Sequence, residues 1–152
     1  MTYRIAGLDP APYKPLFGLS HDELASRGIV PMTVTDATFP CRVSLVDRPI
    51  GDRVLLLNHV SHDVENPYRA SHAIFVADAE QAEFIDQVPP VFEKRVLSLR
   101  GFDRNGMMVD AVIAQPGEAD AAIRKLLENS NIDTINAHNA VRGCLSARVE
   151  RH

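Results

Sequence analysis

Hydrophobic and polar residues alternate over much of this chain, and a side-chain period of two is typical of β-strands that bury one face. Extended runs of this kind, separated by turn residues, occupy residues 1–8, 30–35, 41–46, 53–59, 72–76, 95–102, 107–113, 132–138 and 144–149. We expect about six or seven of these runs to form the strands of one sheet.

Short turns join several of these runs, so the strands are expected to pair antiparallel. The clearest hairpin joins residues 95–102 to residues 107–113 through Asn105-Gly106, a dipeptide that favours the positive φ angles of a tight turn. A second hairpin is expected between residues 41–46 and residues 53–59.

Helices are expected at three places. Ser20 and Glu23 form a capping box at the start of the first helix, and Gly28 is suited to the left-handed position at its end. Residues 118–128 carry a helical apolar stripe, and residues 79–87 are expected to form a weak helix.

These elements together predict the α+β class. We expect a mostly antiparallel, curled sheet of about six or seven strands, open or barrel-like, with two or three helices packed on it. Because the chain contains no repeat, low-complexity tract or Gly/Ser linker, residues 1–152 are expected to form a single domain.

Composition narrows the classes of partner. The 152 residues carry a formal net charge of -4, and their Lys and Arg residues are scattered, so a nucleic-acid partner is not expected. No run approaches the roughly 20 apolar residues of a membrane span, and the first residues lack the features of a signal peptide. We therefore predict a cytoplasmic protein with no membrane partner.

The two cysteines, Cys41 and Cys144, lie too far apart in sequence for a paired metal knuckle. A reducing compartment argues against a disulfide, so either cysteine would do chemistry as a thiol. No glycine-rich phosphate loop is present, and no cofactor is predicted.

Several polar residues stand where predicted strands begin or end, among them His59, His72 and His138. One interpretation is that these strand ends simply reach solvent. The other is that a rigid sheet aims them into one cleft. Of the sites that such a cleft could contain, a zinc or iron site is the least supported, because the three histidines lack the close spacing of metal ligands. No metal is therefore predicted.

A Cys–His site is the sharper hypothesis. Cys144 would be the nucleophile, with His138 or His72 as the base that generates its thiolate. Asn139 or Asp110 would orient the imidazole. Asp110 also has a structural interpretation, in which it pairs with Arg100 across the hairpin.

An anionic small molecule is a second hypothesis, from the class of binding proteins. Forked guanidinium groups bind anions well, although the same side chains can serve only solubility. The arginines that lie near the polar strand ends are Arg42, Arg69, Arg100 and Arg142. Gly143 would let the backbone come close to a bound group.

Five blocks, PCRVSL, VLLLNH, PYRASHAIFV, LSLRGFDRNGMMVDA and AHNAVRGCLSARVER, occur in an order that resembles the bacterial domain-of-unknown-function family 1203 (DUF1203). The resemblance implies a small, stand-alone, cytoplasmic bacterial chain of unassigned activity. Its motifs correspond to Cys41, Arg42, Asn58, His59, Tyr68, Arg69, Arg100, Asp110, His138, Asn139, Arg142, Gly143 and Cys144. Similar sequences often have GPIFV around His72, which favours His59 and His138 over His72.

We therefore expect one pocket between the loop before Cys144 and the strand ends at Asn58-His59 and Asp110. The leading prediction is a small enzyme that acts on an anionic small molecule by hydrolysis or group transfer. The ligand-binding set is Arg142, Gly143, Arg100, Arg42, Asn58, His59, Tyr68 and Arg69. The alternatives are a non-catalytic ligand-binding or regulatory module and a homodimeric interaction domain.

Overall fold

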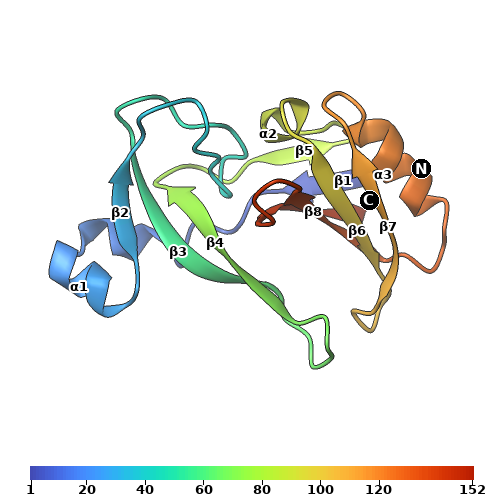
Figure 1. The fold of residues 1–152 in the computed structure, drawn as a ribbon, viewed down its shortest axis with the longest axis horizontal. Coiled ribbons are helices and arrows are strands. Elements are labelled where there is room, and N and C mark those ends of the chain that lie inside the picture. Colours follow the sequence, from blue (N-terminus) through green and yellow to red (C-terminus); the bar gives the residue numbers. More distant parts are fainter.

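Two antiparallel sheets form the framework of the protein, which a computed structural model describes over all 152 residues (Figure 1). The larger sheet has the strand order β5-β1-β9-β8-β6-β7, and the smaller sheet has the order β2-β3-β4. The strands of the larger sheet are β1 (Tyr3–Ala6), β5 (Glu83–Ile85), β6 (Leu97–Phe102), β7 (Met108–Ala114), β8 (Thr134–Asn139) and β9 (Leu145–Arg151). Those of the smaller sheet are β2 (Val30–Thr33), β3 (Arg53–His62) and β4 (Ala70–Ala77).

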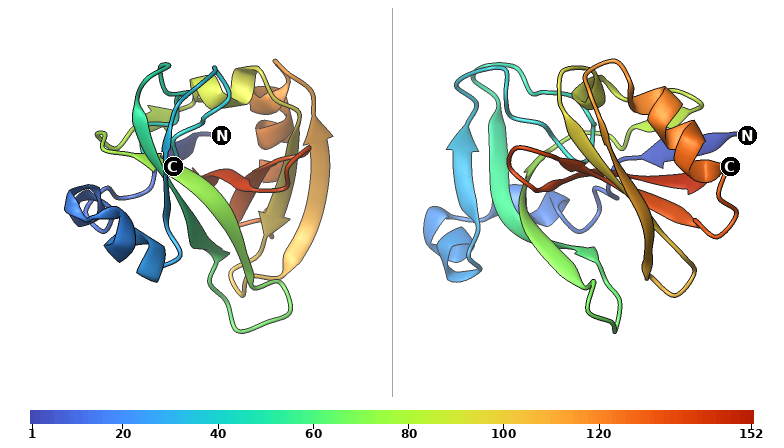
Figure 2. Two further views of the ribbon diagram at one scale, coloured as in Figure 1. Left: turned by 60° about the vertical axis from the view of Figure 1, so that its left-hand side comes forward. Right: turned by 45° about the vertical axis from the view of Figure 1, so that its right-hand side comes forward.

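Short helices lie outside the two sheets (Figure 2). They are the 3₁₀ helix η1 (Lys14–Gly18) and the α-helices α1 (His21–Ser26), α2 (Pro90–Glu93) and α3 (Ala119–Leu127). The predicted capping box of α1 is confirmed, because Ser20 accepts from the Glu23 N–H and the Glu23 carboxylate accepts from the Ser20 N–H. None of these helices has the length and apolar character needed to cross a membrane.

Each sheet has its own hydrophobic cluster. The larger cluster lies between the larger sheet and α3, where Ile123 and Leu127 pack with Ile135 and Val149. The smaller cluster contains Leu24 from α1 together with residues of β3 and β4. The predicted α+β class with antiparallel strands is confirmed, but the strands divide between two sheets and neither sheet closes on itself.

The hairpin predicted around Asn105-Gly106 is confirmed as β6 and β7. The hairpin predicted between residues 41–46 and 53–59 is wrong, because β3 pairs with β2 and β4 instead. Residues 41–45 form a turn in which the Cys41 sulfur accepts backbone N–H groups of Val43, Ser44 and Ala77. The apolar side chains of this segment are buried in the two cores, but its backbone does not pair as a strand.

The weak helix predicted at residues 79–87 is also wrong. This segment contributes β5, which pairs with β1 through Ile5 and Phe84 at the edge of the larger sheet. Phe84 packs against the larger cluster, and tertiary packing of this kind overrides a weak local helix propensity.

Strand β8 is buried on both faces and thereby positions the site. Ile135 and Ala137 belong to the larger cluster, so the alternate residues Asn136 and His138 project from the opposite face. Histidines of the smaller sheet meet this opposite face, since His62 contacts Asn136 and His72 contacts His138. A polar layer therefore lies between the two sheets.

Candidate functional site

The turn between β8 and β9 holds the partly exposed Cys144. The Asn139 N–H donates to the Cys144 carbonyl at 2.9 Å, and the Gly143 N–H donates to the Asn139 carbonyl at 2.7 Å. Gly143 has φ of 81°, a conformation that glycine adopts without strain. This tight turn places the sulfur at the beginning of β9.

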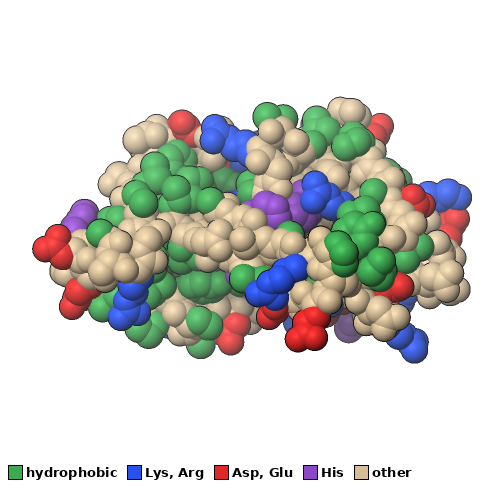
Figure 3. Space-filling model, turned by 60° about the horizontal axis from the view of Figure 1, so that its bottom comes forward, with side chains coloured by type: hydrophobic (Ala, Val, Ile, Leu, Met, Phe, Trp, Pro, Cys, Tyr) green, Lys and Arg blue, Asp and Glu red, His purple; other side chains and the backbone are tan.

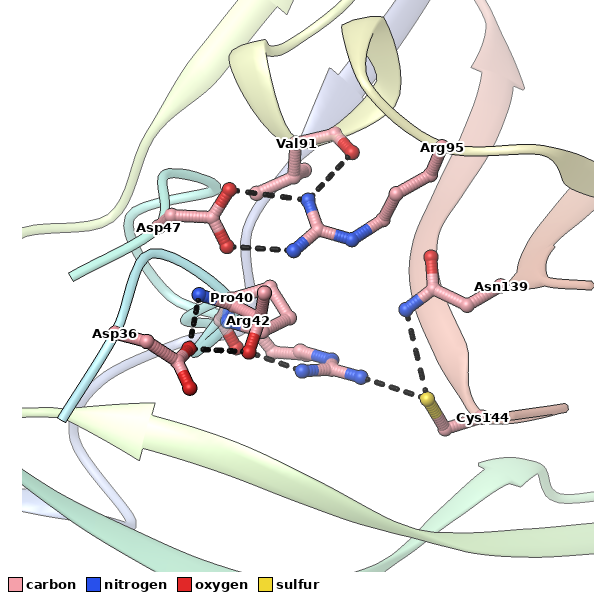
Figure 4. A network of polar contacts seen from close by, with 9 residues as sticks. Asp36, Pro40, Arg42, Asp47, Val91, Arg95, Asn139 and Cys144 are labelled. Carbon is pink, nitrogen blue, oxygen red and sulfur yellow. Dashed lines mark hydrogen bonds and ion pairs between the residues drawn. The ribbon is translucent and has the colours of Figure 1, made fainter. Parts of the chain in front are cut away.

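Arg42, from the turn at residues 41–45, reaches this sulfur from the other half of the molecule (Figure 4). Its Nη2 donates to Cys144 Sγ at 3.1 Å, its Nε to the Leu145 carbonyl at 2.8 Å, and its Nη1 to the Pro40 carbonyl at 2.6 Å. Only 3% of Arg42 is exposed. The guanidinium is therefore almost completely withdrawn from water.

Arg42 has no carboxylate within ion-pair distance, unlike its neighbour Arg95, which forms a bidentate pair with Asp47. Burial lowers the pKa of Arg42, and the neighbouring Cys144 opposes that change. A guanidinium nevertheless stays charged in proteins. Apart from two neutral carbonyls, its hydrogen-bond partner is the Cys144 sulfur, which can become an anion.

Asn139 approaches the same sulfur from β8 (Figure 4). Its Nδ2 donates to Cys144 Sγ at 3.5 Å, while its Oδ1 has no hydrogen-bond partner although the residue is only 8% exposed. The sulfur thus accepts hydrogen bonds from two side chains. One of these two donors is the cationic guanidinium of Arg42.

His138 and Asn139 project from opposite faces of β8, and no hydrogen bond joins His138 to Cys144. Its Nδ1 lies 2.9 Å from the Gly143 carbonyl oxygen, to which a protonated Nδ1 donates. Burial lowers the pKa of His138 to about 4. The imidazole is therefore neutral at pH 7, with its lone pair on Nε2.

His72, on β4, packs edge-on against His138 with 4.9 Å between ring centroids. Its Nδ1 lies 2.9 Å from Ser61 Oγ, and its cross-strand neighbour on β3 is His59. Burial lowers the pKa of both His72 and His59. The sheets thus bring together the three histidines that the sequence singled out.

Arg100 projects from β6 toward the same polar layer. Its Nε donates to Ser98 Oγ at 3.2 Å, and Ser98 lies opposite His138 in the ladder. The pair considered between Arg100 and Asp110 is absent, because Asp110 lies opposite Gly101 in the ladder. Asp110 is exposed on β7, and its carboxylate accepts from the neighbouring Ala111 N–H.

The remaining predicted residues lie outside this cluster. Asn58, Tyr68, Arg69 and Arg142 are exposed, and Arg69 pairs with Asp63. Hydrogen bonds from Thr38 lower the pKa of Asp36, and the charge of Arg142 adds to this effect.

Sequence reasoning missed polar residues that the tertiary structure brings to the cluster. His62 is buried at the end of β3, where its Nε2 lies 2.9 Å from the Gly106 carbonyl and its Nδ1 lies 3.4 Å from Asn136 Nδ2. Ser61 and Ser98 support His72 and Arg100. The one available signal was the alternation of Asn136 with buried aliphatic residues in β8.

No three His, Cys, Asp or Glu side chains are grouped so as to hold a metal ion.

Comparison with known proteins finds one family. A family model described as "Protein of unknown function (DUF1203)" matches residues 38–151, a range that includes every residue of the cluster. The match confirms the family resemblance of the motifs. No curated protein and no solved structure matches the chain.

Proposed function

The chain belongs to the DUF1203 family, whose description names no activity, and for it we propose a small-molecule enzyme in which Cys144 is a thiolate nucleophile. The observation that carries this proposal is the buried Arg42 guanidinium, whose Nη2 lies 3.1 Å from Cys144 Sγ. An unpaired buried charge is costly, and a thiolate would supply the missing counter-ion.

The surroundings of Cys144 suit a nucleophile. Cys144 is a partly exposed residue, as attack on a substrate requires, and Asn139 donates a second hydrogen bond to its sulfur. Cys41 offers the contrast, since it is completely buried and its sulfur accepts only backbone N–H groups. We assign chemistry to Cys144 and a structural role to Cys41.

The roles of the other residues follow from these contacts. Arg42 stabilises the thiolate, whereas the sequence had suggested that His138 or His72 generates it as a base. We assign the attraction of an anionic substrate to Arg100, which has no carboxylate partner, and the buried, neutral His138 has its Nε2 free to accept a proton. The proposed reaction is hydrolysis or group transfer through a covalent Cys144 intermediate.

Alkylation by iodoacetamide at pH 7 tests the thiolate directly. In a Cys41→Ser background, Cys144 is expected to react quickly in the folded protein. In a Cys144→Ser background, Cys41 is expected to react only on unfolding. The Arg42→Met substitution is expected to slow alkylation of Cys144 by about tenfold or more, because it removes an interaction worth over 1.4 kcal/mol.

Two further variants make the result specific. Arg42→Lys keeps the charge and is expected to retain part of the rate. Arg27→Met removes a charge from an exposed arginine without an ion pair, and it is expected to leave the rate unchanged. If Cys144 is inert in the folded wild-type protein, the enzyme proposal fails, and the alternative of a non-catalytic binding module takes its place.

A further inference from the structure

Arg100 carries a second positive charge without a carboxylate partner. It is half-buried, and its one hydrogen bond is from Nε to Ser98 Oγ at 3.2 Å. Neither of its Nη groups has a partner within the chain, so both can donate to a ligand. The fork of the guanidinium suits the oxygen atoms of an oxyanion.

The position of Arg100 places this fork beside two imidazoles. In the ladder between β6 and β8, Ser98 lies opposite His138 and Arg100 lies opposite Asn136. The contact with Ser98 therefore turns the guanidinium toward His138, whose ring packs at 4.9 Å from that of His72. The charge of Arg100 acts on both histidines and helps to lower the pKa of each, after the effect of burial.

Both imidazoles are held by their Nδ1 atoms. His138 Nδ1 contacts the Gly143 carbonyl, and His72 Nδ1 contacts Ser61 Oγ, whose hydroxyl donates to the Ala70 carbonyl. With each Nδ1 committed as a donor, the free nitrogen of each ring is Nε2. On protonation, each Nε2 becomes a donor.

His72 and Arg100 are partly exposed, whereas His138 is buried. Histidine side chains gather in the middle of one face, with Lys or Arg side chains directly beside them (Figure 3). The charged and titratable groups around His72 and His138 are His59, His62 and Arg100, with Arg42 beyond His59. None of them is acidic, so the cluster has no negative charge of its own.

From this geometry we propose that the cluster of Arg100, His72 and His138 binds a phosphate group between the two sheets. The three side chains come from both sheets, and the two imidazole rings are tilted by 72° from each other, which suits a tetrahedral oxyanion. Binding draws a proton onto the imidazoles, because the negative charge of phosphate offsets the cost of a buried imidazolium. The inference goes beyond the proposed function, since it holds whether or not Cys144 reacts.

Calorimetric titration with inorganic phosphate tests the site, in a Cys144→Ser background at pH 6.5 so that thiol chemistry plays no part. We expect the apparent binding heat to depend on the ionisation enthalpy of the buffer, which reports proton uptake. Arg100→Met is expected to weaken binding by about tenfold or more, the loss of one charge-assisted hydrogen bond.

Arg69→Met is the matched control. Arg69 is an exposed arginine that pairs with Asp63 and lines a separate hollow with Val60, Ala70 and Ser71. This substitution is expected to leave phosphate binding unchanged. An equal loss in the Arg69 and Arg100 variants would indicate nonspecific attraction and overturn the proposal, as would the absence of binding.

An NMR titration of the histidine rings needs no variant of the site, so misfolding of a variant cannot explain its result. Saturation with phosphate is expected to raise the pKa of His138 from about 4 toward neutrality and to raise the pKa of His72 as well. Unchanged titration of both rings would overturn the proposal. Because every measurement uses Cys144→Ser, failure here leaves the thiolate proposal intact, and failure of alkylation leaves this site intact.

Discussion

His138 illustrates how one buried residue couples the site to the stability of the protein. It is 2% exposed, and its imidazole is surrounded by His72, His62 and Arg100 rather than by carboxylates. Burial is therefore not offset by an opposite charge, and the neutral form is favoured. Arg42 faces the same cost, but it cannot lose its proton and relies on the Cys144 sulfur instead.

Acid is expected to destabilise the protein through His138. Its pKa is about 4 in the folded protein and 6.5 as the ordinary value, so the unfolded chain binds the proton more readily. This contribution to stability is complete above about pH 6.5 and is lost as the pH falls toward 4. The full effect is on the order of 3 kcal/mol. Urea denaturation at several pH values measures it.

The variant His138→Asn isolates this contribution. It is expected to have a flatter pH profile than the wild type between pH 6.5 and 4, whereas the substitution of the exposed His21 by Asn should change nothing. Superimposable profiles for the wild type and His138→Asn would show that His138 does not cause the acid sensitivity.

The turn at residues 41–45 is the element that brings the two halves of the site together. Its alternate residues enter both cores, since Cys41 and Val43 belong to the smaller cluster and Leu45 belongs to the larger one. Gly7 supports this turn from the end of β1, because the Leu8 N–H donates to the Arg42 carbonyl. The turn therefore depends on a close approach of backbone to backbone.

Gly7→Ala is expected to disturb this turn. An added Cβ would lie 1.9 Å from the Val43 carbonyl oxygen, so the backbone would have to move. We expect a loss of about 2–3 kcal/mol in the free energy of unfolding and slower alkylation of Cys144, because Arg42 is displaced. Chemical denaturation and the iodoacetamide rate measure the two effects.

Gly18→Ala is the matched substitution, because an added Cβ there would meet nothing within 4 Å. It is expected to leave the free energy of unfolding and the alkylation rate of Cys144 close to those of the wild type. Equal effects of the two substitutions would contradict the assignment of a close approach at Gly7.

At the scale of the whole molecule, the two sheets are joined by contacts that cross between them. Arg42 donates to Leu145 of β9, Arg95 pairs with Asp47, and the turn at residues 41–45 contributes to both cores. Unfolding one sheet would remove the contacts that the other sheet makes with it through Arg42 and the turn at residues 41–45. We therefore expect the two sheets to unfold together.

Leu126→Ala tests this cooperativity from one side. Leu126 is 3% exposed in the larger cluster, and truncation of such a leucine costs about 2–5 kcal/mol. Native-state hydrogen exchange is expected to show the same loss of protection for slow amides of β4 and of β8. Ile113→Ala, at an exposed position of β7, is the control. Unchanged protection of β4 would mean that the sheets unfold separately.

The sequence by itself determined the elements that depend on local signals. These are the β6–β7 hairpin at Asn105-Gly106, the capped helix α1, and α3, predicted over residues 118–128 and observed at Ala119–Leu127. It also predicted strands over residues 132–138 and 144–149, which leave only residues 139–143 to join them and so keep Asn139 close to Cys144. Each of these features is decided within about ten residues of chain.

Only the tertiary structure decided the rest of the site. Arg42 and Cys144 are 102 positions apart, and His72 meets His138 from a different sheet. Residues 41–45 became a turn and Glu83–Ile85 became a strand, against their local patterns. Local propensities differ by only about 1 kcal/mol per residue. Burial of a whole apolar side chain contributes more than this to stability, and burial of one unpaired charge costs more. Packing between distant segments therefore determined which polar residues meet.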